Sequence, residues 1–212
     1  MFQGNRKALV FTGVMAVLLG SGAAQAADPA PGVVVRVTDH AGLDAGDLAR
    51  AQVEAERIFA DSGVRLVWTS ISEGREAHAC DGMNVSVALL SPFLIRQLVG
   101  QGMGETVLGS ASPSAGRAFV YAERVYARAE GTRVDAGVLL GRVIAHEVGH
   151  LLLGSRHSRF GLMTTGIDTD PTGLRALFSS QEARSMRRVL ISKTEDKKTR
   201  EACGAVSTAD RY

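Results

Sequence analysis

One stretch decides how this chain folds, the run His146-Glu147-Val148-Gly149-His150-Leu151-Leu152-Leu153-Gly154-Ser155-Arg156-His157. It continues an apolar stretch from Val138 to Ala145, and the spacing of the apolar residues predicts one long helix over 133–153. Asp135 is the expected N-cap of this helix, and Gly154 is the residue expected to end it.

Two histidines on the predicted helix are spaced to bind one metal ion. His146 and His150 are four residues apart, so they lie on one face of the helix, one turn from each other. A neutral imidazole nitrogen is a good zinc ligand. Glu147 is offset around the helix, so we expect it beside the ion as a general base rather than as a ligand.

A catalytic zinc site has a third protein ligand and an open fourth position. His157 is the candidate, because Gly154 can adopt the left-handed conformation that lets the chain turn back toward the ion. Three carboxylates remain as alternatives, by analogy with zinc enzymes that use one: Asp168, Asp170 and Glu182. The set predicts one Zn²⁺, which lowers the pKa of a bound water to near 7, and a glutamate that accepts its proton, as in peptide-bond hydrolysis.

The rest of the chain alternates strand and helix patterns. Short apolar or β-branched runs predict strands at 33–37, 64–69, 84–90, 106–111 and 117–121. Helical spacing predicts helices at 43–60, 93–99, 133–153 and 181–191. No internal repeat or interdomain linker is visible. The pattern is typical of an α+β domain with a mixed sheet and one long active-site helix.

The first 26 residues have the composition of a signal peptide. Arg6 and Lys7 precede an apolar run, and Ala24-Gln25-Ala26 is a cleavage signal, which leaves a mature domain over 27–212. We expect a secreted or periplasmic protein with no stable membrane span after cleavage; an uncleaved anchor is the alternative. The remaining 22 basic residues balance the 22 acidic ones without a basic stripe, so nucleic acid is not an expected partner. We expect a monomer.

Two cysteines, Cys80 and Cys203, are the only ones in the chain. An even number of cysteines in an exported chain favours a disulfide. Two unrelated buried thiols are the alternative. A zinc-ligand role is disfavoured because the two lack the close spacing of Cys-type sites.

The segment from His146 to His157, with Gly161-Leu162-Met163 after it, resembles the metzincin clan of zinc metalloproteases. The clan motif is H-E-x-x-H-x-x-G-x-x-H followed by a methionine turn. The resemblance implies that Met163 forms a hydrophobic floor under the metal ligands. This chain departs from the motif, because Leu153 stands where the clan has glycine and His157 comes one residue late.

The resemblance extends upstream to a matrixin-like edge strand over 106–112. It implies a mostly parallel twisted sheet of about five strands packed on the active-site helix, with an N-terminal subdomain over 27–154 and a small helical C-terminal subdomain over 155–212. An extended peptide or protein substrate would add to the edge strand. The implied substrate-binding residues are Thr106, Leu108, Ser110 and Ser112. The chain also resembles uncharacterised bacterial exported zincin-like proteins.

Three hypotheses follow. The first is a zinc-dependent endopeptidase with His146, His150 and His157 as ligands and Glu147 as general base. The second is a zincin-like binding module that keeps the metal but has no turnover. The third is a structural cell-envelope protein without metal, which gives no reason for a carboxylate at position 147.

Overall fold

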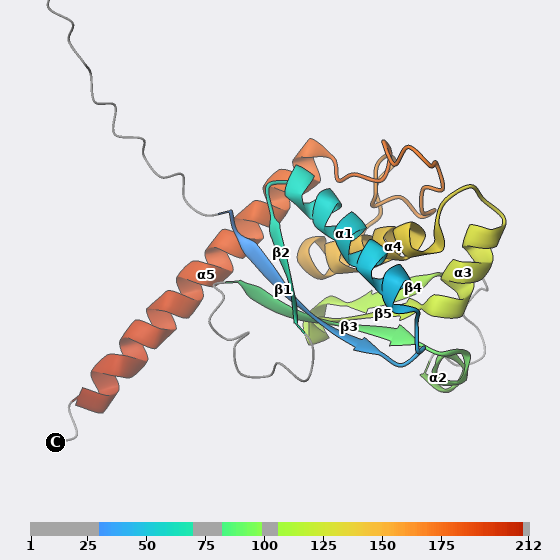
Figure 1. The fold of residues 1–212 in the computed structure, drawn as a ribbon. Helices are drawn as coiled ribbons and strands as arrows, with labels where there is room; N and C mark the ends of the chain where they lie inside the picture. The colour runs from blue at the N-terminus through green and yellow to red at the C-terminus, as the bar shows by residue number, and fades with distance from the viewer. Residues whose placement is uncertain (1–29, 70–81, 99–105, 210–212) are drawn as a thin grey trace, which may run out of the picture.

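The fold, known from a computed structural model, is described for residues 30–69, 82–98 and 106–209 (Figure 1). The strands are β1 (Gly32–Asp39), β2 (Arg65–Thr69), β3 (Met83–Leu90), β4 (Gly109–Ser112) and β5 (Arg117–Tyr121). The helices are α1 (Ala45–Asp61), α2 (Pro92–Leu98), α3 (Ala122–Glu130), α4 (Ala136–Leu153) and α5 (Ser180–Ala209), with a 3₁₀ turn at Pro113–Ala115.

The five strands form one mixed sheet in the order β2-β1-β3-β5-β4. Four of them are parallel, and β4 alone runs antiparallel, pairing from Gly109 opposite Val120 to Ser112 opposite Arg117. The prediction of a mixed, mostly parallel sheet of about five strands is therefore confirmed. Because β4 is the last strand in the order, no strand of the described chain pairs with its other backbone edge.

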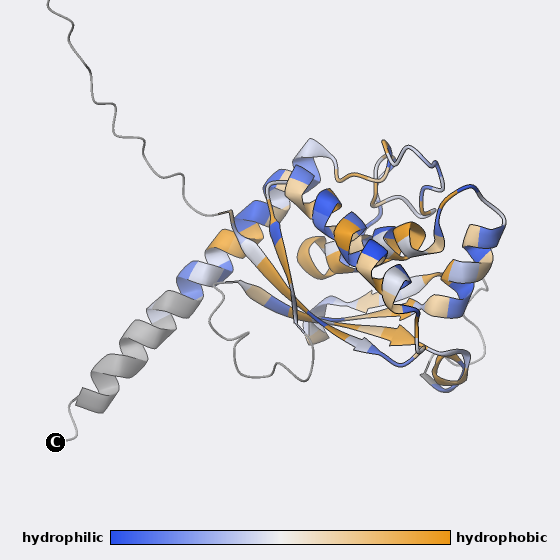
Figure 2. Ribbon diagram, in the orientation of Figure 1, coloured by the Kyte–Doolittle hydropathy of each residue, from blue (hydrophilic) through white to orange (hydrophobic). Residues whose placement is uncertain are grey.

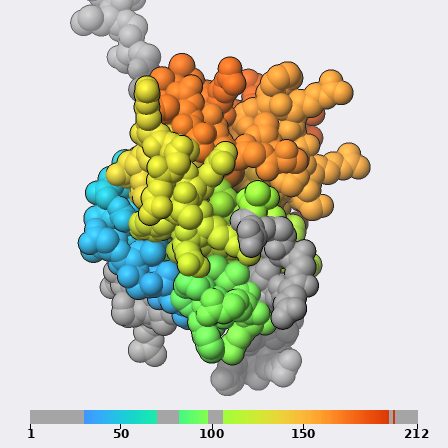
Figure 3. All heavy atoms as spheres, turned by 90° about the vertical axis from the view of Figure 1, so that its right-hand side faces the viewer, coloured from blue at the N-terminus to red at the C-terminus, as the bar shows by residue number. Residues whose placement is uncertain are grey.

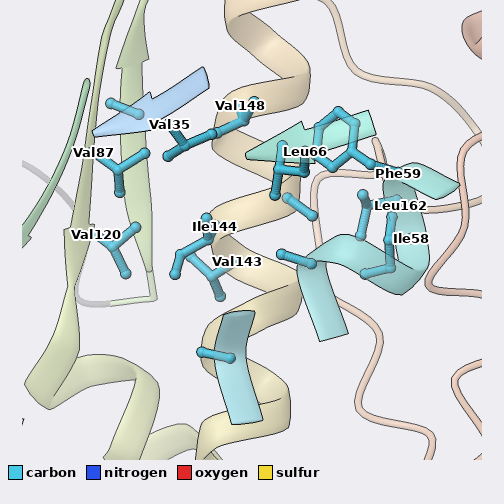
Figure 4. Close-up of a cluster of buried hydrophobic side chains, with 14 of the residues drawn as sticks. Val35, Ile58, Phe59, Leu66, Val87, Val120, Val143, Ile144, Val148 and Leu162 are labelled. Carbon is cyan, nitrogen blue, oxygen red and sulfur yellow. The ribbon is translucent and has the colours of Figure 1, made fainter. Parts of the chain in front are cut away.

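Alternation along the strands produces the core. Val33 and Val35 of β1 and the odd-numbered residues of β3 face the same side, where α1 and α4 cover the sheet (Figures 1 and 2). Figure 4 shows this cluster, with Val143, Ile144 and Val148 of α4 directed toward the valines of the sheet. The opposite face carries a smaller cluster of Leu90, Ile95 and Tyr121, which α2 covers.

The two main helices approach each other closely. A Cβ added at Gly141 of α4 would lie 2.5 Å from the carbonyl oxygen of Ala51 in α1, so a side chain there would force the helices apart. Asp44 caps α1 as its side chain accepts from the backbone N–H of Gly46 and Asp47, and Asp135 caps α4 in the same way. By length and hydropathy α4 also passes as a membrane span, but most of it is buried inside the domain, as in a core helix.

The structure differs from the predicted elements in three places. The chain forms α3 directly after β5, where no helix was predicted, because only Val125 and Ala129 bury apolar surface beyond its first residue. Strand β4 begins at Gly109 rather than Thr106. Helix α5 continues well past Ile191, where its apolar periodicity stops.

Several predictions fall outside the described residues. The signal peptide over 1–26 and Cys80 are among them, and the side chain of Cys203 is likewise not described. The signal peptide and the Cys80–Cys203 disulfide therefore remain predictions, as does the division into subdomains at residue 154.

Candidate metal centre

The two helical histidines are held with their outer ring nitrogens facing each other. His146 Nδ1 lies 2.8 Å from the carbonyl oxygen of Leu162, and His150 Nδ1 lies 2.9 Å from that of Gly154. A carbonyl oxygen only accepts, so in each neutral ring the proton is on Nδ1 and Nε2 carries a lone pair. The two Nε2 atoms are 3.0 Å apart. Two lone pairs at this distance repel each other unless a cation lies against both.

The third histidine reaches the same point. His157 places a ring nitrogen so that one nitrogen from each of the three histidines lies within 4.8 Å of the others. The longer turn is absorbed at Gly154, whose φ of 88° and ψ of −175° is a conformation that glycine adopts readily and other residues rarely do. The prediction that Gly154 adopts the left-handed helical conformation is therefore wrong in ψ, although its φ is positive as that conformation requires.

The charge state of the histidines suits metal binding. Burial lowers the pKa of His146 to about 4, with the neighbouring histidines adding to the effect. Burial, and then His150, also lowers the pKa of His157. Imidazoles with lowered pKa values are neutral at pH 7, which is the form that binds metal. Three imidazoles that converge on one point are a zinc-type ligand set, so the group fits one Zn²⁺.

The alternative carboxylate ligands are not part of this group. Among the described residues, the three histidines form the one cluster of ligand atoms that could hold an ion. Glu182 instead caps α5, accepting from the N–H of Ser179, and it also accepts from the Ser158 hydroxyl. Asp170 accepts from Thr172, and Asp168 accepts from the N–H of Asp170.

Met163 packs against α4 at Gly149, the residue before the ligand His150. It is 1% exposed, and a Cβ added at Gly149 would lie 2.7 Å from its sulfur. Gly149 lies between His146 and His150 in the sequence. Any side chain at this position would collide with the methionine sulfur, so a glycine is needed for Met163 to approach the helix this closely. This contact agrees with the floor role implied by the resemblance.

Glu147 is buried beside the histidines without a partner. It is 5% exposed, and no hydrogen bond or ion pair reaches its carboxyl group from the described residues. Burial raises its pKa to about 8. A Cβ added at Gly109 would lie 2.7 Å from Glu147 Oε1, so β4 passes directly over this group. A cation on the histidines would favour the ionised carboxylate and lower this pKa again.

A cleft of about 830 Å³ opens over these groups. Its walls come from β4 with the residues before it, from α3, and from the segment after α4. Of the predicted substrate-binding residues, Thr106, Leu108 and Ser110 line the cleft, and Ser112 is not among the lining residues. Figure 3 views the face on which α3 (yellow) borders the segment after α4 (orange).

A second charged group on α4 was missed by the sequence analysis. Arg142 lies one turn before His146, is 1% exposed, and donates to Glu54 Oε1 at 3.2 Å. It also donates to the carbonyl oxygens of Asp168 and Asp170, and so holds the segment that follows the methionine turn. An arginine inside an apolar helical run was the available signal, but its partner is 88 residues away.

No family model matches the chain, and no curated protein matches its sequence. The structure is similar to a zinc-dependent peptidase from Methanocorpusculum labreanum, with 14% identity, a TM-score of 0.47, and coverage of 73% of this chain and 99% of the other. It is also similar to archaemetzincin from Methanopyrus kandleri, with 14% identity, a TM-score of 0.45, and coverage of 82% and 99%. At these values the similarity by itself assigns neither family nor activity.

Proposed function

We propose that this protein is a zinc-dependent endopeptidase that acts on peptide or protein substrates in the periplasm or outside the cell. The observation that carries the proposal is the position of an unpartnered carboxyl group, Glu147, next to three converging histidine nitrogens in one cleft. A purely structural metal site has no use for a buried carboxyl group that neither binds the metal nor accepts a hydrogen bond.

The residues of the chain have separate roles in this proposal. A bound zinc ion supplies Lewis acidity, since it lowers the pKa of a coordinated water and polarises a carbonyl oxygen. Glu147 accepts the proton of the attacking water and then donates it to the leaving amine nitrogen. The carbonyl oxygens of Leu162 and Gly154 orient His146 and His150 through Nδ1, and Met163 packs against α4 at Gly149.

The edge strand β4 supplies the surface for the substrate. Gly109, Ser110 and Ala111 of this strand line the cleft, and Gly109 brings the strand directly over Glu147. An extended peptide that pairs with this edge would place a backbone carbonyl next to Glu147. Thr106, Leu108 and Ser110 are the proposed contacts along this wall.

The test is zinc-dependent hydrolysis by the mature chain, residues 27–212. A broad peptide library is incubated with the protein as purified, after chelation, and after zinc is restored, and products are identified by mass spectrometry. We expect about one zinc per chain, and cleavage that chelation abolishes and zinc restores. A protein that binds one zinc and cleaves nothing would instead be a zincin-like binding module. A protein that binds no zinc would exclude both.

A further inference from the structure

The cleft has a cationic end that the hydrolytic chemistry does not use. Arg124, Ala127 and Arg128 all line the cleft, and all three lie on α3. Ala127 and Arg128 come three and four residues after Arg124, so both lie on the same side of the helix as Arg124. The sole carboxyl group among the lining residues of the described chain is Glu147.

The two arginines are held differently. Arg124 donates from Nη1 to the carbonyl oxygen of Val107 at 3.0 Å, and its guanidinium lies 5.2 Å from the centre of the Tyr121 ring. It is therefore fixed against the chain that leads into β4. Arg128 is exposed, one turn further along α3, and makes no hydrogen bond or ion pair with any residue in the described ranges. A fixed cation beside one that is available suits an anionic group of a ligand.

The direction of β4 determines which part of a bound substrate would approach the arginines of α3. Tyr121 donates to the carbonyl oxygen of Leu108, and Arg124 to that of Val107, so α3 begins beside the chain just before β4. A substrate peptide would pair antiparallel with the free edge of β4, because antiparallel pairing is slightly more stable per residue than parallel pairing, and it would then run opposite to β4. It passes Ser112 first, then Gly109 above Glu147, and reaches Val107 and α3 last. The residues that follow the cleaved bond therefore approach the arginines.

We propose that Arg128, with Arg124 beside it, is a carboxylate-recognition site for the part of the substrate that follows the cleaved bond. The inference rests on the proposed function and names the substrate class, which is peptides with a carboxylate about two or three residues after the cleaved bond, because Val107, which Arg124 contacts, lies two residues before Gly109 above Glu147. The carboxylate belongs either to an acidic side chain or to the C-terminus of the substrate. Arg128 is a specificity-determining residue in this account, and Glu147 remains the proton carrier.

The first experiment compares peptides that share one cleaved sequence. They carry Glu or Gln at the second and third positions after the cleaved bond, each with a free or an amidated C-terminus. We expect kcat/KM of the zinc-loaded protein to be roughly three- to fivefold higher for the carboxylate-bearing peptides, the size of a partly exposed ion pair. The Glu and Gln pairs report a side-chain carboxylate, and the free and amidated pairs report a terminal one.

Matched variants assign the preference to one residue. Arg128→Gln should reduce the ratio to near one, and Arg128→Glu should invert it in favour of a peptide with Lys at that position. Arg133→Gln removes the same charge from an exposed residue just beyond α3 that does not line the cleft, and it should keep the wild-type ratio. Equal kcat/KM for all peptides, or a preference that survives Arg128→Gln, would overturn the inference while leaving the proposed function intact.

A binding measurement separates this inference from the proposed function. Fluorescein-labelled Glu and Gln peptides are titrated with the Glu147→Gln protein and with Glu147→Gln/Arg128→Gln, and fluorescence anisotropy is followed. We expect tighter binding of the Glu peptide by the first protein and equal binding of both peptides by the second. If the wild type cleaves nothing, the proposed function fails, and this titration still decides whether Arg128 recognises a carboxylate.

Discussion

Two glutamates are buried among the residues that the structure describes, and their surroundings are opposite in kind. Glu54 on α1 is 9% exposed and accepts from Arg57 and Arg142, both arginines lying within 3.2 Å of its carboxylate oxygens. Burial alone would raise its pKa, but these hydrogen bonds outweigh burial and keep the pKa below its usual value. Glu147 on α4 is 5% exposed, has no such partner, and has a pKa raised to about 8.

The difference indicates that one buried glutamate stabilises the fold and that the other is available for chemistry in the cleft. The Glu54 carboxylate on α1 binds Arg142 of α4, and Arg142 in turn binds the carbonyl oxygens of Asp168 and Asp170. The charge of Glu54 therefore helps to hold these three parts of the chain together. Glu147 is reached by no donor in the described chain, so its carboxyl group is free to exchange a proton with a ligand in the cleft. The arrangement costs stability at Glu147 and adds it at Glu54, and both effects can be measured.

The largest effect is expected on catalysis. Glu147→Gln keeps the shape of the side chain but removes the proton acceptor, so kcat/KM should fall by about 10²–10⁴-fold. Zinc content should stay at the wild-type value, because the three histidines are unchanged. Cleavage by this variant at the wild-type rate, with zinc bound, would remove Glu147 from the proposed chemistry.

Replacing Glu54, the paired glutamate, should lower the stability of the protein. Glu54→Gln leaves Arg142 buried without a counter-charge, and we expect the free energy of unfolding to fall by about 3–5 kcal/mol. Urea unfolding of the metal-free protein measures it. Glu56→Gln, an exposed glutamate on the same helix, is the control and should change little. A double replacement of Glu54 and Arg142 by apolar residues should recover much of the loss, and no recovery would contradict an uncompensated arginine as the cause.

The same substitution at Glu147 should have the opposite effect on stability. Its folded pKa of about 8 lies above the ordinary value of 4.5, so the unfolded chain ionises first as pH rises. Glu147→Gln should therefore stabilise the metal-free protein by on the order of 2–4 kcal/mol at pH 8, with no gain below about pH 4.5. A gain independent of pH would point to packing rather than to ionisation.

The pH dependence of Glu54 has the reverse sign. Its folded pKa is depressed, so the stabilisation is fully present above the unfolded value of 4.5 and is lost as pH falls through the folded pKa. The difference in unfolding free energy between wild type and Glu54→Gln should shrink accordingly in acid. Unfolding curves collected from pH 7 down to pH 3 test this, and a constant difference would contradict the ion pair.

The smallest effect is expected where β4 meets the proposed base. Gly109→Ala places a Cβ 2.7 Å from Glu147 Oε1, so either the strand or the carboxyl group must shift. We expect kcat/KM to fall by about tenfold, in line with the sensitivity of catalysis to misplacement of ~1 Å or less. Zinc content should be unchanged. The control is Gly166→Ala on the other side of the cleft, where a Cβ meets nothing within 4 Å.

The sequence predicted most of what local spacing controls. The helical register of His146, Glu147 and His150 follows from their positions alone, and short apolar or β-branched runs located all five strands. Glu182 was predicted only as an alternative zinc ligand, although Ser179 and Glu182 form the S-x-x-E pattern of a helix start and this local signal indicates the cap that the structure shows.

What the sequence did not predict depends on contacts between distant segments. Arg142 and Glu54 carry no local pattern that pairs them. Helix α3 was missed because it buries little apolar surface, and the arginines on its cleft face became visible only once the helix was placed. His157 reaches the other histidines because of the backbone conformation of Gly154. The sequence could not establish this, because His157 comes one residue later than in the clan motif.

A structure of the zinc-loaded protein tests the central claim most directly. The account predicts one ion bound by a single ring nitrogen each of His146, His150 and His157 at about 2.0–2.1 Å. The Glu147 carboxylate should lie next to the ion without binding it, facing the cleft below Gly109. An ion held by His146 and His150 with His157 outside bonding distance, or one that takes Glu147 as a ligand, would contradict it.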